Sequence, residues 1–324
     1  MLRFITMLIS LLPFVASAAD QVVIIAGKGG QPQFTQKYAQ YARSMYDVLI
    51  TKHGFTPQQI TVLAEREASL PFANAACSAE QVRAAFARLT NTVQTGDLVI
   101  VILFGHGSFD GNWAKFNLEG PDLRDLDFAQ LLDGLPAQRQ VFINTTATSG
   151  PFIEKLSRPN RLVITATRSG AEHYTTMFPE YFVEAFLKPE EADLDKNGQV
   201  SLLEAFDYSR DRMVRFYESA NRLRPEHPLL DDDGDGIGSE TPSAIGGDGQ
   251  LAARTYFLAH TTPTPRTTLD ADHPLEKEKR RLLAEIETLK ARKNAMPEGD
   301  YNRKIEELFI RLAKLNRRIK SEAK

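Results

Sequence analysis

The sequence predicts an α/β protein built on a doubly wound, mostly parallel sheet. Between residues 20 and 187, five short apolar runs rich in β-branched residues alternate with longer amphipathic stretches. Runs that are apolar at every position suit strands covered by helices on both faces. Alternation of such strands with helices favours parallel pairing through crossover connections. The runs are 22–26, 60–63, 98–104, 141–143 and 162–165.

The stretches between the first runs have the spacing of amphipathic helices. Apolar residues recur three or four positions apart in each of them, as expected for a helix with one buried face. In the first stretch these are Phe34, Tyr38, Tyr41 and Met45, and in the second Val82, Ala85, Phe86 and Leu89. Ser78 and Gln81 fit a capping box at the start of the second helix.

Length and composition exclude several classes of protein. The 324 residues are enough for one large domain with accessory segments, and 42% hydrophobic residues can build a core. The single cysteine excludes a disulfide framework and a four-cysteine zinc site. A net charge of -3 gives no electrostatic case for nucleic-acid binding.

Residues 1–19 are predicted to be a signal peptide. Arg3 precedes the apolar run 4–15, and Ala16-Ser17-Ala18 provides small residues before the cleavage point. The run is shorter than an ordinary transmembrane helix. We expect an exported protein, periplasmic or secreted, with no transmembrane segment in the mature chain. An uncleaved anchor is the alternative.

Polar residues follow the third and fourth predicted strands directly. Gly105-His106-Gly107-Ser108 comes after the run 98–104, and the segment 145–150 comes after the run 141–143. Open α/β sheets bind ligands at the carboxyl ends of their strands. A histidine placed there can act as a base, and glycine amides can approach an oxyanion. A turn histidine bonded to nearby backbone is the alternative interpretation.

The order of these motifs resembles the caspase and legumain-like cysteine peptidases over about residues 20 to 187. His-Gly follows a hydrophobic strand preceded by Gly-Asp, Ser-Gly follows the next strand, and Thr-Ala follows a fifth. In that family the histidine pairs with the cysteine of a Cys-x-Ser-Gly motif to cleave peptide bonds. The resemblance implies that His106 is the base and that Gly107 supplies an oxyanion-hole amide. It also implies a substrate pocket in the loop 168–174, with Thr167, Arg168 and Glu172 as candidate residues.

The nucleophile of that family is absent from this chain. When Ser149-Gly150 is set on the family's Ser-Gly pair, Ala147 takes the cysteine position. A methyl group cannot form the covalent intermediate. Cys77 is expected far from the strand ends, as a buried structural residue.

The predicted site at these strand ends therefore has two competing interpretations. We expect a pseudopeptidase that binds a peptide or protein ligand. The alternative is a peptidase whose hydroxyl nucleophile is activated by His106, with Thr146, Thr148 and Ser149 as the candidates.

Residues 193–204 match the twelve-residue EF-hand pattern. Oxygen-bearing side chains stand at positions 1, 3, 5 and 9, Gly198 at position 6 permits the sharp turn, and Glu204 at position 12 can supply two oxygens. The sequence predicts a Ca²⁺ site, typical of a structural clamp, and an acidic surface turn is the alternative. The candidate ligands are Asp193, Asp195, Asn197, Gln199, Ser201 and Glu204.

A second acidic segment, residues 231–236, has a related pattern. Asp231, Asp233 and Asp235 alternate there, but no Glu stands at the twelfth position. The segment is either a second, irregular calcium loop or a solvated turn. Residues 251–258 that follow are a candidate edge strand.

The C-terminal part is predicted to be helical and separate. A Thr-Pro linker over residues 261–268 leads to a tail, residues 271–324, that carries 15 Lys plus Arg against 10 Asp plus Glu. Apolar residues repeat every seven positions on both sides of the break at Pro297-Glu298-Gly299-Asp300. We expect a helical hairpin or coiled coil over residues 270–324, which either oligomerises or folds back on its own body.

These patterns divide the chain into four parts. They are the signal peptide 1–19, a caspase/legumain-like α/β domain 20–222 that includes the EF-hand-like loop, an irregular segment 223–269, and the helical hairpin 270–324. A third hypothesis for function follows from the last part, namely a structural envelope protein that assembles through its C-terminal helices.

Overall fold

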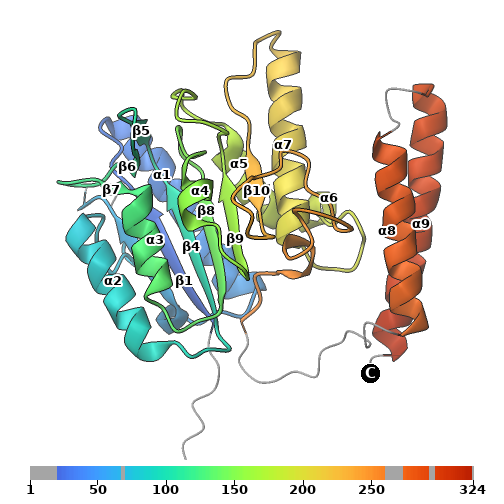
Figure 1. Ribbon diagram of the computed structural model, residues 1–324, viewed down its shortest axis with the longest axis horizontal. Coiled ribbons are helices and arrows are strands. Elements are labelled where there is room, and N and C mark those ends of the chain that lie inside the picture. Colours follow the sequence, from blue (N-terminus) through green and yellow to red (C-terminus); the bar gives the residue numbers. More distant parts are fainter. Residues whose placement is uncertain (1–19, 67–69, 260–272, 292–295, 323–324) are drawn as a thin grey trace, which may run out of the picture.

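The computed structural model describes residues 20–66, 70–259, 273–291 and 296–322. The expected signal peptide, residues 1–19, and the Thr-Pro linker, residues 261–268, lie outside this part of the chain. Within it, an α/β body contains a twisted sheet between two layers of helices, and two long C-terminal helices lie beside the body (Figure 1).

Seven of the described strands form the central sheet. Their order is β10-β9-β8-β4-β1-β2-β3, and every neighbouring pair is parallel except β10 with β9. The predicted α/β class with a mostly parallel sheet is thus confirmed. The strands are β1 Gln21–Ala26, β2 Ile60–Ala64, β3 Ala75–Ala76, β4 Leu98–Phe104, β8 Arg139–Asn144, β9 Arg161–Thr165 and β10 Leu229–Asp231.

Alternate side chains of each strand feed two separate hydrophobic cores. In β1, Val22 and Ile24 point into one core, whereas Val23 and Ile25 point into the other. Each fully buried aliphatic or aromatic side chain stabilises the fold by about 1.5–3 kcal/mol. This two-sided burial explains why the strands read as continuous apolar runs.

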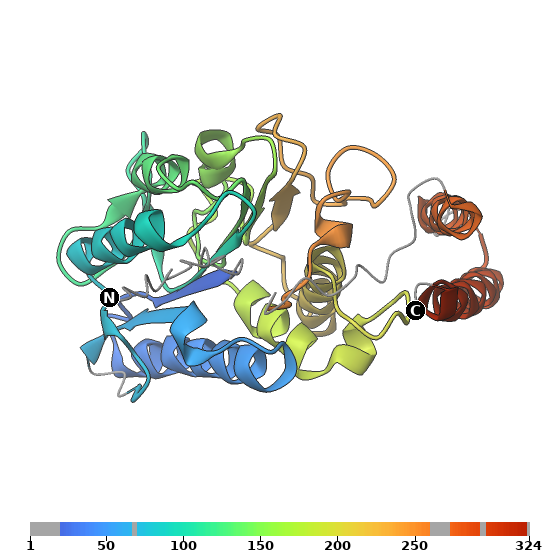
Figure 2. The same ribbon diagram turned by 90° about the horizontal axis from the view of Figure 1, so that it is seen from below.

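Helices cover both faces of the sheet (Figure 2). One face is covered by α1 Pro32–Lys52, α5 Phe178–Leu187 and α7 Leu202–Ser219, and the other by α2 Ala79–Thr92, α3 Asp125–Asp133 and α4 Phe152–Leu156. The Ser78 side chain accepts a hydrogen bond from the Gln81 amide at 3.3 Å, which caps the start of α2. The short helices η1 Pro57–Gln59 and α6 Pro189–Ala192 precede β2 and the acidic loop.

A small antiparallel sheet follows β4, and the sequence analysis missed it. It has the order β5-β6-β7, with β5 Gly107–Phe109, β6 Ala114–Phe116 and β7 Leu123–Arg124. Phe116 anchors it, because its ring packs where a Cβ on Gly27 or Gly105 would lie only 2.6 or 2.9 Å away. The glycines after β1 and β4 therefore make room for this sheet beside the strand ends.

The candidate edge strand at 251–258 is wrong. This segment contains the 3₁₀ helix η3 Ala252–Arg254, and β10 forms the edge of the sheet instead. The buried carboxylate of Asp232 explains the turn, since it accepts hydrogen bonds from the amides of Gly249 at 2.8 Å and Ala252 at 2.7 Å. Those bonds curl the chain before it can extend along a strand.

The C-terminal helices are α8 Pro274–Ala291 and α9 Glu298–Glu322. They lie side by side and share an apolar cluster made of Leu275, Leu282, Ile286, Leu312, Leu315 and Ile319 (Figure 1). None of the helices in the described part of the chain combines the length and the apolar character needed to cross a bilayer.

Candidate functional site

The loops after β4 and β8 meet at the carboxyl edge of the sheet. The two strands pair directly, so His106 and Ala147 follow neighbouring strands. The two loops are in close contact at Gly107. A Cβ there would lie 2.2 Å from the Ala147 carbonyl oxygen and 2.6 Å from Thr146 Oγ1. Only a residue without a side chain fits at this approach.

The His106 ring lies against helix α1. It packs edge-on against Phe34 and Tyr38, with ring centroids 4.8 and 5.3 Å apart, and the Tyr38 hydroxyl lies 3.2 Å from Nδ1. Burial lowers the pKa of His106, opposed by the Gly29 backbone and by the charge of Glu65. The surroundings therefore favour the neutral form of this imidazole over the charged one.

The Ser149 hydroxyl is committed to the turn after β9. Its oxygen accepts hydrogen bonds from the amides of Ala166 at 3.1 Å and Thr167 at 3.2 Å, and lies 3.1 Å from Thr167 Oγ1. Ser149 is fully buried. These bonds tie the loop after β8 to the next strand.

The two threonines beside Ala147 differ from each other. Thr146 Oγ1 donates to Asn144 Oδ1 at 2.8 Å. Thr148 has a left-handed φ of 54°, and its buried hydroxyl has no hydrogen-bond partner among the described residues. Thr148 is therefore the hydroxyl candidate that the turn does not use.

The loop 168–174 is held by Glu172. Its carboxylate accepts from the Arg168 amide at 3.0 Å and lies 2.6 Å from Nδ1 of His227. Its backbone oxygen accepts from the Thr148 amide at 2.8 Å, which joins this loop to the Ala147 loop. Thr167 is buried, whereas the Arg168 side chain is 58% exposed and faces solvent at the rim.

Cys77 lies nearer to the strand ends than expected. Its amide donates to the Ala64 carbonyl at 3.1 Å, which places it at the carboxyl end of β2. The expectation that it is distant from this edge is wrong, because β3 carries the chain back there. Strand β1 still separates β2 from β4 and His106. Burial raises the pKa of the Cys77 thiol to about 12, so the thiol is protonated and unreactive.

The acidic loop 193–204 brings three carboxylates together. Oxygens of Asp193, Asp195 and Glu204 all lie within 4.8 Å of one another. Gly198 has a φ of 90°, and its amide donates to Asp193 Oδ2 at 2.9 Å. The left-handed turn at position 6 therefore folds the loop around its own first residue.

Glu204 is buried, as is Asp193. It accepts hydrogen bonds from the amides of Leu194 at 2.9 Å and Asp195 at 3.1 Å, and from the Ser201 amide at 2.9 Å. Burial, and then the charge of Asp195, raises the pKa of Glu204 to about 7. Burial also raises the pKa of Asp193. The arrangement crowds like charges, as expected of a cation site.

The remaining predicted ligands surround this cluster. Asn197 Nδ2 lies 3.4 Å from the Tyr256 hydroxyl, and Ser201 Oγ donates to Glu204 at 2.8 Å. Gln199 is exposed, as suits a position that contributes its backbone carbonyl. All donors of this set are oxygens, which fits a hard divalent cation.

A second carboxylate cluster includes a residue that the sequence analysis missed. Asp231 and Asp233 lie within 4.8 Å of Asp248, which comes from beyond the acidic segment. Burial, with the neighbouring charges of Asp231 and Asp233, raises the pKa of Asp248 to about 7. Its position in sequence gave no signal, because the chain loops away between residues 236 and 248.

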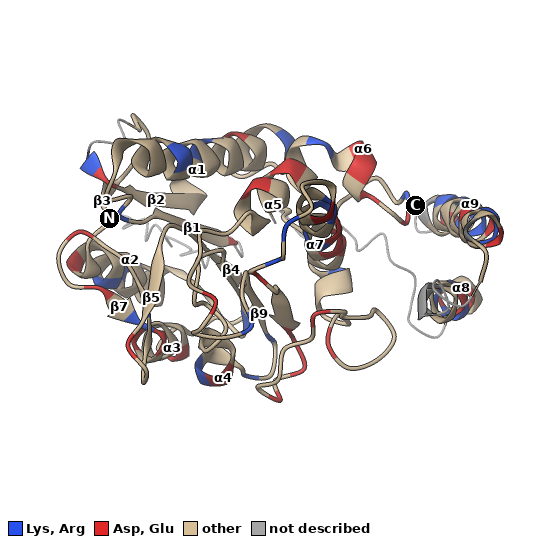
Figure 3. Ribbon diagram, turned by 90° about the horizontal axis from the view of Figure 1, so that it is seen from above, with Lys and Arg blue, Asp and Glu red and all other residues tan. Residues whose placement is uncertain are grey.

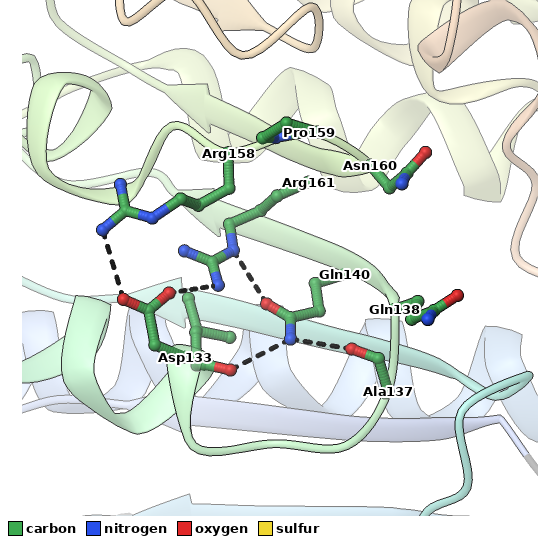
Figure 4. Close-up of a pocket in the computed structure, with 9 residues that line it drawn as sticks. Asp133, Ala137, Gln138, Gln140, Arg158, Pro159, Asn160 and Arg161 are labelled. Atoms are coloured by element: carbon green, nitrogen blue, oxygen red, sulfur yellow. Dashed lines mark hydrogen bonds and ion pairs between the residues drawn. The ribbon is translucent and has the colours of Figure 1, made fainter.

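A pocket of about 450 Å³ lies at the opposite edge of the sheet, near the amino ends of β8 and β9 (Figure 4). Asp133 bridges Arg158 at 3.2 Å and Arg161 at 2.8 Å, and Arg161 Nε donates to Gln140 Oε1 at 2.7 Å. The charged groups are thus paired with each other. This pocket holds an ion-pair network, distant from the strand-end loops.

Comparison with known proteins finds solved structures with a similar fold. No protein-family model and no curated protein matches the chain. Similar solved structures include a protein from Geobacter sulfurreducens, 12% identical, with a TM-score of 0.45 over 74% of this chain and 99% of that one. Another is the Drosophila initiator caspase Dronc, 12% identical, with a TM-score of 0.41 over 67% of this chain and 80% of that one. At this identity neither likeness bears on chemistry.

Proposed function

We propose that this chain is an exported, calcium-binding pseudopeptidase of the caspase and legumain-like type, whose strand-end cleft binds a peptide or protein segment without cleaving it. The observation that carries the proposal is the convergence of Asp193, Asp195 and Glu204 within 4.8 Å in the acidic loop. The methyl group of Ala147, which offers no nucleophile, and the packing of the His106 ring against Phe34 and Tyr38 support the non-catalytic part.

Calcium suits the acidic loop better than a transition metal. Neither histidine nor cysteine belongs to the described cluster, and oxygen ligands favour Ca²⁺ or Mg²⁺. A flexible loop with a terminal Glu that offers two oxygens suits the larger ion. Asp193, Asp195, Asn197 and Glu204 would hold it with their side chains, and Gln199 with its carbonyl. The bound ion would neutralise the crowded carboxylates and fix the start of α7.

Isothermal titration calorimetry on the chelator-treated protein tests the calcium site. We expect binding that Glu204→Gln weakens about 100-fold or more, because the variant loses a negative oxygen at the bidentate position. The matched control is Glu154→Gln, an exposed Glu whose carboxylate pairs with Lys155. Wild-type protein that takes up no calcium, or binding that is equal in both variants, contradicts the proposal.

Two exposed aromatic side chains near the strand ends support peptide binding. Tyr174, in the loop 168–174, is 62% exposed, and Phe109, at the end of β5, is 39% exposed. Incubation with a broad peptide library, followed by mass spectrometry, separates binding from cleavage. We expect retained but intact peptides, and weaker retention by Tyr174→Ala.

The hydroxyl-peptidase alternative reduces to one residue. Thr148 alone among the three candidates has a hydroxyl without a hydrogen-bond partner in the described part of the chain. Cleavage of library peptides that is lost in both Thr148→Val and His106→Ala would establish that alternative over the pseudopeptidase.

Export and assembly belong to the same proposal. The apolar run 4–15 supports export, and N-terminal sequencing of protein from the producing cell tests it, with a mature chain that starts at about residue 20 as the expected result.

Oligomerisation through residues 270–324 is the structural alternative. Light scattering of the full chain and of a chain ending at residue 269 tests it, since only the full chain would assemble.

A further inference from the structure

The C-terminal helices contact the body at the acidic loop. Asn316 of α9 donates from Nδ2 to the Asp195 backbone oxygen at 2.9 Å. Lys279 of α8 places Nζ 3.5 Å from Asp195 Oδ2. Both helices therefore reach the same residue, which stands at the third position of the loop. Figure 3 shows acidic residues on and after α6, on the side of the body where α9 lies.

This contact is partly shielded from solvent. Asn316 is 8% exposed, and the side chains of Lys279 and Asp195 are 23% and 16% exposed. An ion pair at such a position is screened less than one on the open surface. The ammonium of Lys279 thus offsets part of the negative charge that the carboxylates of the loop accumulate.

We propose that Lys279 is a tethered competitor of calcium, and that calcium binding loosens the α8–α9 pair from the body. The proposal rests on the calcium site proposed above. Without metal, Lys279 occupies the Asp195 carboxylate. A divalent cation in the loop would bind the same carboxylate and repel the Lys279 ammonium, so calcium binding and the Lys279–Asp195 ion pair weaken each other. Because the two effects are thermodynamically linked, they are equal in size: Lys279 weakens calcium binding, and calcium weakens the docking of α8 and α9 by the same factor.

The two contacts have different roles. Asn316 binds a backbone oxygen at position 3, whereas an EF-hand uses the side chain at that position and the backbone oxygen of position 7. The metal therefore does not compete for the atom that Asn316 uses. Asn316 holds α9 in place, and Lys279 makes that placement sensitive to calcium.

Calcium titration of the full chain measures the coupling. We expect Lys279→Gln to bind calcium about five- to tenfold more tightly than wild type, at the lower end of the coupling that is typical between linked sites. The matched control is Arg281→Gln, which removes the same charge from the same helix. The Arg281 side chain is 85% exposed and pairs with Glu285 of its own helix, so its variant should keep the wild-type affinity.

A distance measurement reports docking directly. Spin labels on Glu190→Cys and Asn302→Cys, two exposed positions on α6 and α9, would span the contact, and the fully buried Cys77 should stay unlabelled. We expect a narrow distance distribution without metal that broadens on calcium addition. In Lys279→Gln the distribution should stop responding to calcium. In Asn316→Ala it should be broad from the start.

The outcomes separate this inference from the calcium site. If wild type binds calcium and Lys279→Gln shows neither altered affinity nor an altered distance response, the coupling is overturned while the site stands. If no variant binds calcium, including Lys279→Gln, both proposals are overturned.

Discussion

The polar groups of the strand-end loops around Ala147 and those of the acidic loop are paired in opposite ways. In the strand-end loops, most polar side chains bind each other, as Ser149 does with Thr167 and Glu172 with His227. In the loop, Asp193 and Glu204 have raised pKa values because they are buried near the charge of Asp195. Internally satisfied groups fix a shape, whereas carboxylates crowded together are relieved when a cation binds among them. The comparison teaches that the acidic loop has the arrangement that could hold a metal ion, and that the polar groups around Ala147 mainly join neighbouring loops.

The largest expected effect tests whether the cleft hydroxyls are structural. Ser149→Ala leaves the buried amides of Ala166 and Thr167 without their acceptor, and we expect a loss of about 2–4 kcal/mol in the free energy of unfolding. Urea denaturation measures it. Ser219→Ala is the control, since that exposed hydroxyl bonds only the Phe216 carbonyl in its own helix. A loss below about 0.5 kcal/mol for Ser149→Ala would show that the hydroxyl is free for another role.

The second prediction concerns Asp195, whose replacement should lower the stability relative to wild type in the presence of calcium but not in its absence. Calcium at one hundred times its dissociation constant should stabilise wild type by about 2.7 kcal/mol. Asp195→Asn should bind about tenfold more weakly and gain about 1.4 kcal/mol. Without calcium the variant should be at least as stable as wild type, because the charge that raises the pKa values of Asp193 and Glu204 is gone.

Thermal unfolding with and without calcium measures both halves of this prediction. The order of stability of wild type and Asp195→Asn should reverse when calcium is added. A variant that is less stable by the same amount in both conditions would mean that Asp195 acts through its hydrogen bond to the Asn197 amide, and not through its charge.

The sequence predicted the elements that have a local signal. Each of the five apolar runs lies on a strand of the central sheet, because residues buried on both faces must be apolar at consecutive positions. The Ser78 cap and the turn at Gly198 were likewise visible in a few neighbouring residues.

Features that depend on contacts between distant residues were not predictable in this way. The three strands after His106 are two or three residues long, too short to show alternation. Asp248 joins Asp231 only through the tertiary fold, and the bonds of Asp232 override the strand-like pattern of 251–258. The packing of His106 on α1 also needed the structure, since the sequence places a histidine at an edge without its orientation.

The third prediction concerns the protonation of the cleft histidine. Burial lowers the pKa of His106 in the folded state, so the unfolded chain binds more protons near pH 6.5. The stability that neutral His106 contributes is present above pH 6.5 and is lost as the pH falls from there through the folded pKa. The difference in unfolding free energy between wild type and His106→Gln should therefore shrink from pH 8 to pH 5. His173→Gln, at an exposed position, provides the control. A difference that grows in acid would mean that the fold favours the charged ring, as an active dyad does.

The smallest expected effect comes from placing a thiol at position 147. For Ala147→Cys we expect no peptide cleavage and slow alkylation by iodoacetamide. The reason lies in the surroundings: the Tyr38 hydroxyl lies 3.2 Å from Nδ1 of His106, and burial lowers the pKa of this histidine, which disfavours the imidazolium that would have to pair with a thiolate. Mass spectrometry gives the alkylation rate, with buried Cys77 as an internal reference, and a peptide library reports cleavage. Cleavage by Ala147→Cys that disappears in the double variant with His106→Ala would show that His106 can act as the base for a thiol at position 147, and would contradict this expectation.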